Sequence, residues 1–169
     1  MTTYKKRQST QKNRLIRDGY CFFPRILDAP MLERVCQVSD RLIDAQSPEH
    51  FEERKSTGSM ISVYEDTFFA ELVAYQPALD ILAELGYLRP RWSSGYVISK
   101  PPHSPPLFWH QDWLGWNEPI SYTDVPQQLF LMYYLVDTDQ ENGCLRVIAG
   151  SHRKRHALHS ITEEAHADN

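Results

Sequence analysis

A short segment in the second half of the chain places an imidazole and a carboxylate at a spacing that suits a metal ion. His110 and Asp112 lie two residues apart within the aromatic-rich residues 107–113. On an extended strand, residues i and i+2 face the same side, so both donor atoms can reach one ion. Two histidines and one carboxylate leave adjacent positions open, as in non-haem Fe(II) oxygenases. Such triplets also arise by chance, in which case His110 is a surface residue beside a polar turn.

The residues before this segment are predicted to be mainly helical. Apolar residues at three- and four-residue spacing predict a helix over 30–45, with Asp28 as its N-cap. Asp66 is expected to cap a second helix with Phe68, Phe69, Leu72 and Val73 inward, and Pro77 and Gly86 to bound a third. The polar residues 46–62 are predicted to form a loop.

From residue 87 onward the pattern changes to that of strands. Residues 96–98, 128–136 and 144–149 are predicted strands, and the apolar run 128–136 has the length of a buried one. Asn142-Gly143 is typical of a tight hairpin turn between two of them. Helices followed by strands indicate an α+β chain with an antiparallel sheet.

Four motifs follow one another along the chain: Gly95–Pro102, His110-Gln111-Asp112, Asn142–Leu145 and Gly150–His152. In this order, and with the opening Asp18-Gly19-Tyr20, they resemble the phytanoyl-CoA dioxygenase family from about Arg14 to Arg153. The resemblance implies an Fe(II)- and 2-oxoglutarate-dependent oxygenase on a double-stranded β-helix. We therefore expect an α+β fold with N-terminal helices packed on a jelly roll that is incomplete in this chain. The activity implied is hydroxylation of a small organic substrate by O2, with succinate and CO2 as co-products.

The resemblance also implies roles for single residues. His110 and Asp112 match the first two iron ligands, and Lys100 matches a basic residue that reaches 2-oxoglutarate in relatives. A lysine with its ammonium in solvent at a strand end is an equal alternative for Lys100. Met132 lies where relatives place a cosubstrate-contacting side chain, although packing in the core is the stronger expectation for a methionine in this apolar run.

Relatives take the second histidine ligand and an arginine for 2-oxoglutarate from late strands, so the chain reads as a member truncated at the C-terminus. His156 and His159 could bind zinc from one helical face, but a solvated tail is the more typical structure. The alternative function is a truncated or non-catalytic member that binds a small acid or a partner without turnover. An unstable fragment, and more distantly a cupin-like metal isomerase, are further alternatives.

Composition limits the class of protein. The 169 residues carry a net charge of −4, which argues against a nucleic-acid binder. No segment has the apolar length of a membrane span or a signal peptide, and three cysteines without a C-x-x-C pair are typical of reduced thiols in the cytoplasm. We expect a basic flexible tail over 1–13, a dioxygenase-like domain over 14–153, and a histidine-rich polar tail over 154–169 that continues into missing strands.

Overall fold

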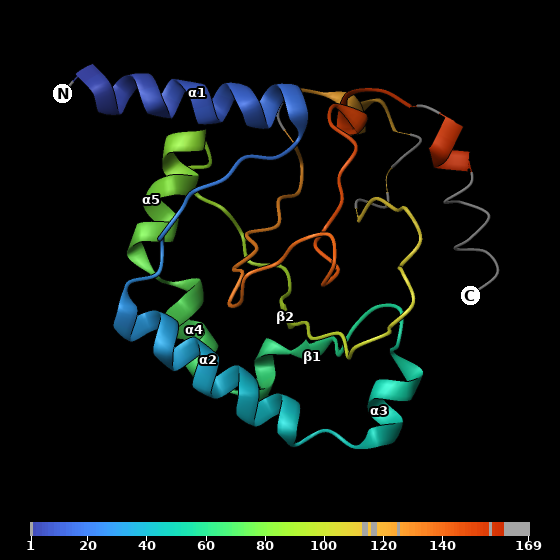
Figure 1. Ribbon diagram of the computed structural model, residues 1–169. Coiled ribbons are helices and arrows are strands. Elements are labelled where there is room, and N and C mark those ends of the chain that lie inside the picture. The colour runs from blue at the N-terminus through green and yellow to red at the C-terminus, as the bar shows by residue number, and fades with distance from the viewer. Residues whose placement is uncertain (1, 113–114, 116–117, 125, 156, 161–169) are drawn as a thin grey trace. The chain divides into compact units, whose positions relative to one another are not determined.

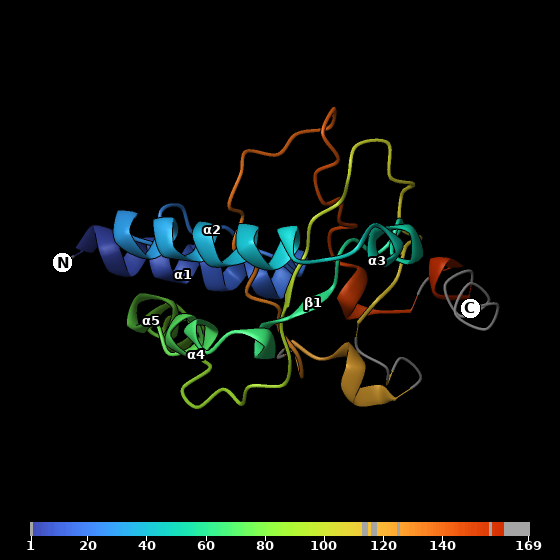
Figure 2. The same cartoon turned by 90° about the horizontal axis from the view of Figure 1, so that it is seen from below.

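A computed structural model of the chain describes residues 2–112, 115, 118–124, 126–155 and 157–160. These residues belong to two compact units. One unit consists of Phe23–Leu107, and the other combines the residues up to Phe22 with those from Phe108 onward. Figures 1 and 2 show the elements of each unit from two directions.

The unit Phe23–Leu107 begins with helix α2, Ala29–Asp44. The Asp28 carboxylate accepts a hydrogen bond of 2.9 Å from the Met31 N–H, and Pro30 lies in the first turn. The N-cap satisfies one of the N–H groups that a helix start leaves without a partner. Val35 and Leu42 are buried on its apolar face. The helix predicted over 30–45 is confirmed.

Two shorter helices, α4 (Phe68–Val73) and α5 (Gln76–Leu85), complete the apolar core of this unit. Phe68, Phe69 and Leu72 are buried, as predicted, but Val73 is 37% exposed, so the expectation that it faces inward was wrong. Gly86 ends α5 at a φ of 109°, a conformation that glycine adopts without strain. The short helix predicted between Pro77 and Gly86 is thereby confirmed.

Charged side chains join α2 to α4, which lie side by side in Figures 1 and 2. Arg41 pairs with Asp66 at 2.5 Å, and Arg34 donates two hydrogen bonds to Glu71 at 2.7 and 3.0 Å. The hydrogen bond from Arg41 is the main cause of a lowered pKa of Asp66. Asp66 also accepts from the N–H of Phe68, the first residue of α4, at 2.7 Å, although Thr67 occupies the N-cap position. The carboxylate predicted as the cap therefore lies one residue earlier and joins the start of α4 to α2.

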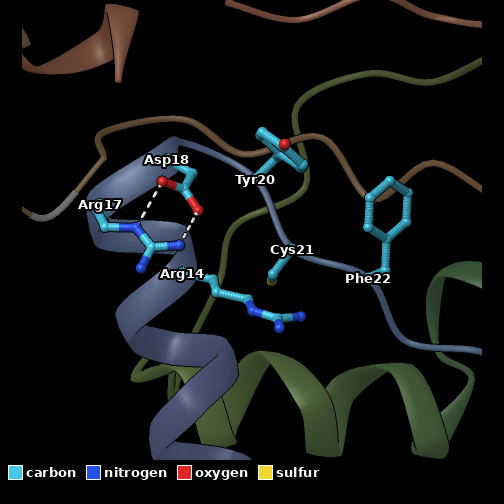
Figure 3. Close-up of a pocket in the computed structure, with 6 residues that line it drawn as sticks. All are labelled: Arg14, Arg17, Asp18, Tyr20, Cys21 and Phe22. Carbon is cyan, nitrogen blue, oxygen red and sulfur yellow. Dashed lines mark hydrogen bonds and ion pairs between the residues drawn. The ribbon is translucent and has the colours of Figure 1, made fainter. Parts of the chain in front are cut away.

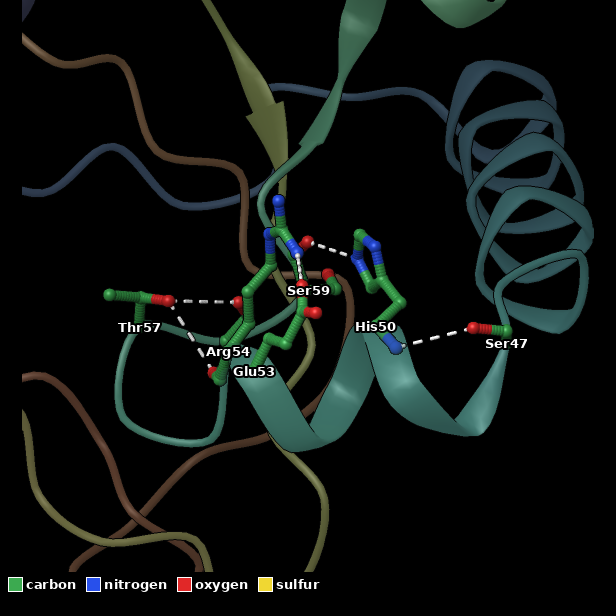
Figure 4. Close-up of polar contacts among 7 residues, drawn as sticks. Ser47, His50, Glu53, Arg54, Thr57 and Ser59 are labelled. Carbon is green, nitrogen blue, oxygen red and sulfur yellow. Dashed lines mark hydrogen bonds and ion pairs between the residues drawn. The ribbon is translucent and has the colours of Figure 1, made fainter.

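The segment predicted as a loop, 46–62, contains a short helix and a strand. Helix α3 spans Pro48–Glu53, and strand β1 spans Ile61–Ser62. The Ser47 hydroxyl accepts from the His50 N–H at 3.3 Å, and the His50 ring donates from Nε2 to the Ser59 carbonyl at 2.6 Å (Figure 4). These short-range polar contacts order the segment, which carries little apolar periodicity.

Strand β2, Tyr96–Val97, pairs antiparallel with β1, and the fully buried Ser59 extends that pairing. The Ser59 hydroxyl donates to the Val97 carbonyl at 2.8 Å and accepts from the Ser99 N–H at 3.0 Å. The Ser59 N–H donates to the Ser99 carbonyl at 2.9 Å. The 3-10 helix η1, Val63–Glu65, follows β1 directly. The strand predicted over 96–98 is thus present in shorter form.

The N-terminal residues differ from the predicted flexible tail over 1–13, because helix α1 spans Thr2–Asp18. Lysine, arginine and glutamine all favour helix, and one side of α1 is anchored. Leu15 and Gln11 are buried, and the Gln11 amide donates to the Phe22 carbonyl. In the part of the chain that the structure describes, no helix is long and apolar enough to cross a membrane.

The predicted jelly roll is not seen among the described residues, where the sheet consists of β1 and β2. Residues 128–136 and 144–149, predicted as strands, have no regular structure, and Phe130 and Val136 are 53% and 73% exposed. A buried strand requires hydrogen-bonded neighbours and an apolar layer on its faces, which a local apolar run cannot supply alone. The 3-10 helices η2, Pro119–Tyr122, and η3, Ser151–Arg153, are the elements found around them.

The turn predicted at Asn142-Gly143 is present, although it joins no paired strands among the residues described. The Asp139 carboxylate accepts from the Asn142 N–H at 3.0 Å, and the Cys144 N–H donates to the Asp139 carbonyl at 2.8 Å. Gly143 has a φ of 85°. The turn residues therefore adopt their usual conformation here, although the described residues on either side do not pair as a hairpin. The domain boundaries at residues 14 and 153 stay predictions.

Replacing Ser59 by alanine is expected to destabilise the unit Phe23–Leu107. The substitution leaves the buried Val97 carbonyl and Ser99 N–H without their hydroxyl partner, at a cost of about 1–3 kcal/mol in the free energy of unfolding. Urea denaturation measures the change. The control is Ser93→Ala at an exposed serine, which should change stability by less than about 0.5 kcal/mol. Equal stabilities for the two variants would contradict the assigned role.

Asp66→Asn is expected to reduce stability at neutral pH and to have a smaller effect in acid. The folded-state pKa of Asp66 is lowered, so its interactions stabilise the fold above about pH 4 and are lost as the pH falls through that pKa. Thermal unfolding from pH 7 to pH 3 should show the two proteins converging. Asp40→Asn removes the same charge from an exposed position of α2 and serves as control. A difference that stays constant over the whole range would overturn the assignment.

Candidate functional site

The structure brings together the two residues predicted as metal ligands. His110 Nε2 lies 3.6 Å from Asp112 Oδ1 in a segment without helical structure. The His110 side chain is 30% exposed and that of Asp112 is 55% exposed. The i and i+2 spacing therefore places both donor atoms on one side of the chain, where solvent or a ligand can reach them.

A backbone hydrogen bond fixes the chemical form of His110. Its Nδ1 lies 2.9 Å from the Phe108 carbonyl oxygen, which can only accept, so Nδ1 carries the proton and donates. The Phe108 ring also meets the imidazole edge-on, with centroids 5.5 Å apart. In the neutral ring the lone pair is then on Nε2, the atom that faces Asp112. This is the arrangement typical of histidines that bind metal ions.

The donor set of His110 and Asp112 fits a divalent transition-metal ion. Bonds of about 2.1 Å at a right angle would place two donors about 3 Å apart, so the observed 3.6 Å requires only a small adjustment. Imidazole nitrogen and carboxylate oxygen are also the ligand types of the Fe(II) facial site. Within the described ranges, no group of three or more His, Cys, Asp or Glu side chains could hold a metal ion.

The other histidines of the C-terminal region lie apart from this pair or outside the described residues. His152 donates from Nε2 to the Ile16 carbonyl at 3.0 Å, and His159 is buried with its ring against Tyr122. His156 lies outside the described residues, so the possible zinc pair with His159 stays a prediction. The bond of His152 joins residues far apart along the chain and leaves no pattern in the sequence.

Lys100 belongs to the unit Phe23–Leu107. Its ammonium donates to the Pro105 carbonyl at 2.9 Å, and its side-chain stem lies over Gly58, where a Cβ would come within 3.1 Å of Lys100 Cγ. The lysine is exposed, and its bond to a loop carbonyl is one that an anion could replace. Its role toward 2-oxoglutarate stays a prediction.

Met132 is 51% exposed within the irregular segment 128–136. The expectation that it packs in the core was therefore wrong, because no strand among the described residues pairs with this segment to bury it. Its predicted contact with the cosubstrate is untested.

Trp109 precedes the predicted metal pair and is 40% exposed, with the Arg146 guanidinium 5.3 Å from its ring centroid. A cation over an indole face is a favourable contact, which sequence spacing could not indicate because 37 positions separate the two. Trp113 and Trp116, which follow the predicted metal pair in the sequence, lie outside the described residues.

A pocket of about 310 Å³ lies beside the end of α1, and none of the predicted site residues is among those that line it (Figure 3). Two arginines line it, but Arg17 is held by Asp18 through hydrogen bonds of 2.7 and 2.6 Å, which lower the pKa of Asp18. Burial raises the pKa of the Cys21 thiol in its wall, which disfavours the reactive thiolate. The C-terminal end of a helix also repels anions. We assign no ligand to this pocket.

Comparison of the sequence with known proteins identifies the family to which the chain belongs. The sequence model described as phytanoyl-CoA dioxygenase (PhyH) matches residues 15–169. No curated protein and no solved structure matches the chain. The match spans nearly the whole sequence and includes the His110 and Asp112 pair, so the chain belongs to the phytanoyl-CoA dioxygenase family.

Proposed function

We propose that this protein is an Fe(II)- and 2-oxoglutarate-dependent dioxygenase that hydroxylates a small organic substrate. Membership of the phytanoyl-CoA dioxygenase family suggests oxygenase activity of this type. The observation that carries the proposal is the hydrogen bond from His110 Nδ1 to the Phe108 carbonyl, since it leaves Nε2 free to bind a metal beside Asp112.

In this proposal His110 and Asp112 hold Fe(II). The bound iron would activate O2 for oxidation of 2-oxoglutarate and substrate, with succinate and CO2 as co-products. The Phe108 carbonyl keeps the imidazole oriented and its Nδ1 protonated, which makes Nε2 a better ligand. Asp112 supplies a negative charge that offsets part of the metal charge. Trp109, next to His110 in the sequence, contacts the Arg146 guanidinium over its ring, which restrains the segment that carries the pair.

Lys100 and Met132 are proposed to contact 2-oxoglutarate. The Lys100 ammonium would exchange the Pro105 carbonyl for a carboxylate, a stronger acceptor because it is charged. Met132, exposed on its segment, offers a polarisable thioether that can pack on the carbon chain of the cosubstrate.

The compartment proposed for the protein is the cytoplasm. Cys21, Cys36 and Cys144 are free thiols, which supports a reducing environment. The net charge of −4 supports small molecules rather than nucleic acid as partners.

Replacing His110 by alanine is expected to abolish binding of Fe(II) with 2-oxoglutarate. The wild-type chain, titrated anaerobically with both, should develop the visible charge-transfer band of a chelated complex, and the variant should not. His103→Asn, which removes an exposed histidine from the other unit, should leave the band unchanged. Absence of a band in the wild-type chain would reject the proposed activity. In that case a non-catalytic member of the family would be the better description.

Lys100→Met is expected to weaken 2-oxoglutarate binding without preventing metal binding. Loss of one hydrogen bond to a charged group costs about 1.5–3 kcal/mol, equivalent to roughly 10- to 150-fold in the dissociation constant. The measurement is the 2-oxoglutarate dependence of the same band at saturating Fe(II). An unchanged dissociation constant would show that the lysine is only a surface residue.

A further inference from the structure

The C-terminal end of α1 is closed by a turn from the other end of the sequence. A helix leaves its last carbonyl groups without partners inside the helix. In α1 the Asp18 carbonyl accepts from the Gly150 N–H at 2.9 Å, and the Ile16 carbonyl accepts from His152 Nε2 at 3.0 Å. The turn Gly150–His152 thus supplies two of the missing donors, one from the backbone and one from a side chain.

The contact between this turn and the end of α1 is closest at Gly19. Gly19 has a φ of 87°, and a Cβ there would lie 2.7 Å from His152 Nδ1. Gly150 has a φ of 78°, and a Cβ there would lie 3.6 Å from the Arg17 carbonyl oxygen. The histidine ring is half-buried. The turn is therefore seated against the helix end with no room for a side chain at position 19.

The same turn contacts the segment that carries the metal pair. Gln111, the residue between His110 and Asp112, is half-buried and donates from its amide to the Ser151 carbonyl at 3.5 Å. Because neighbours on an extended chain alternate in direction, Gln111 is expected to face away from the two donor atoms. One side of the segment can then bind a metal while the other is held by the turn.

We propose that the turn Gly150–His152 is the positioning element of the metal pair. It is fixed to α1 through Gly150 and His152, and it holds the segment of the pair through Ser151 and Gln111. The fixed end of α1 thereby holds the turn in place, and the turn in turn keeps His110 and Asp112 at the spacing that a metal ion requires. This inference rests on the proposed function, since it concerns the same metal site.

The first test removes the contact between the turn and the metal segment. Gln111→Met keeps the length of the side chain but removes its donor. Co(II), used in place of Fe(II) on the full chain, reports affinity and coordination through its visible absorption. We expect the Co(II) affinity to fall about 10-fold or more, as for other groups that support metal ligands, and the spectrum to change. Gln128→Met, at an exposed glutamine, should bind Co(II) as the wild-type chain does.

The second test separates positioning from folding. His152→Ala removes the donor to Ile16, whereas His152→Gln places an amide nitrogen near the former Nε2. Hydrogen exchange of the Gly19 and Gly150 amides should accelerate in the alanine variant and return toward the wild-type rate in the glutamine variant. The affinity for Co(II) should fall in His152→Ala and return toward the wild-type value in His152→Gln. The hydrogen-exchange measurement needs no metal, so it reports directly whether the turn still closes the end of α1.

The outcomes distinguish this inference from the function it rests on. If the wild-type chain binds Co(II) and Gln111→Met and His152→Ala bind it equally well with the same spectrum, the positioning role is overturned and the proposed function stands. If the wild-type chain binds no Co(II), the metal site fails and the positioning role fails with it. If His152→Ala does not fold, Gln111→Met alone decides, because it leaves the contacts of α1 intact.

Discussion

The last carbonyl groups of helix α1 require hydrogen-bond donors from outside the helix. The residues that supply them lie more than a hundred positions away along the chain. The turn Gly150–His152 meets that need, and through Gln111 it also contacts the segment of His110 and Asp112. In a unit whose described residues contain no paired strands, hydrogen bonds of this kind replace the ladder of a sheet as the source of order. The proposed metal pair lies on an irregular segment, so its geometry depends on such contacts.

Ser59 has the equivalent role in the unit Phe23–Leu107. The two-residue strands β1 and β2 are too short to be stable by themselves, and the buried hydroxyl adds bonds to the Val97 carbonyl of β2 and to the Ser99 N–H just after it. Helix α3 is joined to this serine by the hydrogen bond from the His50 ring to the Ser59 carbonyl. In both units a single polar side chain satisfies backbone groups that regular secondary structure leaves open.

The sequence predicted best those features that depend on neighbouring residues. Helix α2 followed from its N-cap and apolar spacing, and the pairing of His110 with Asp112 followed from their separation by one residue. The predictions for 128–136 and for Met132 were wrong because burial of a strand depends on distant partners. The basic composition of residues 1–13 concealed a helix, since the charges gave no apolar stripe and the anchoring bond reaches Phe22. Contacts to backbone carbonyls, such as that of His152, leave no pattern in a sequence.

The lack of space between Gly19 and His152 has a consequence for how this sequence can change over evolutionary time. A side chain at position 19 would collide with the imidazole, and a smaller residue at position 152 would open the space but remove the donor to α1. Neither position can vary freely while the other stays fixed. Positions 19 and 152 should therefore covary among descendants of this protein, a correlation between two ends of the gene that does not depend on the proposed metal site.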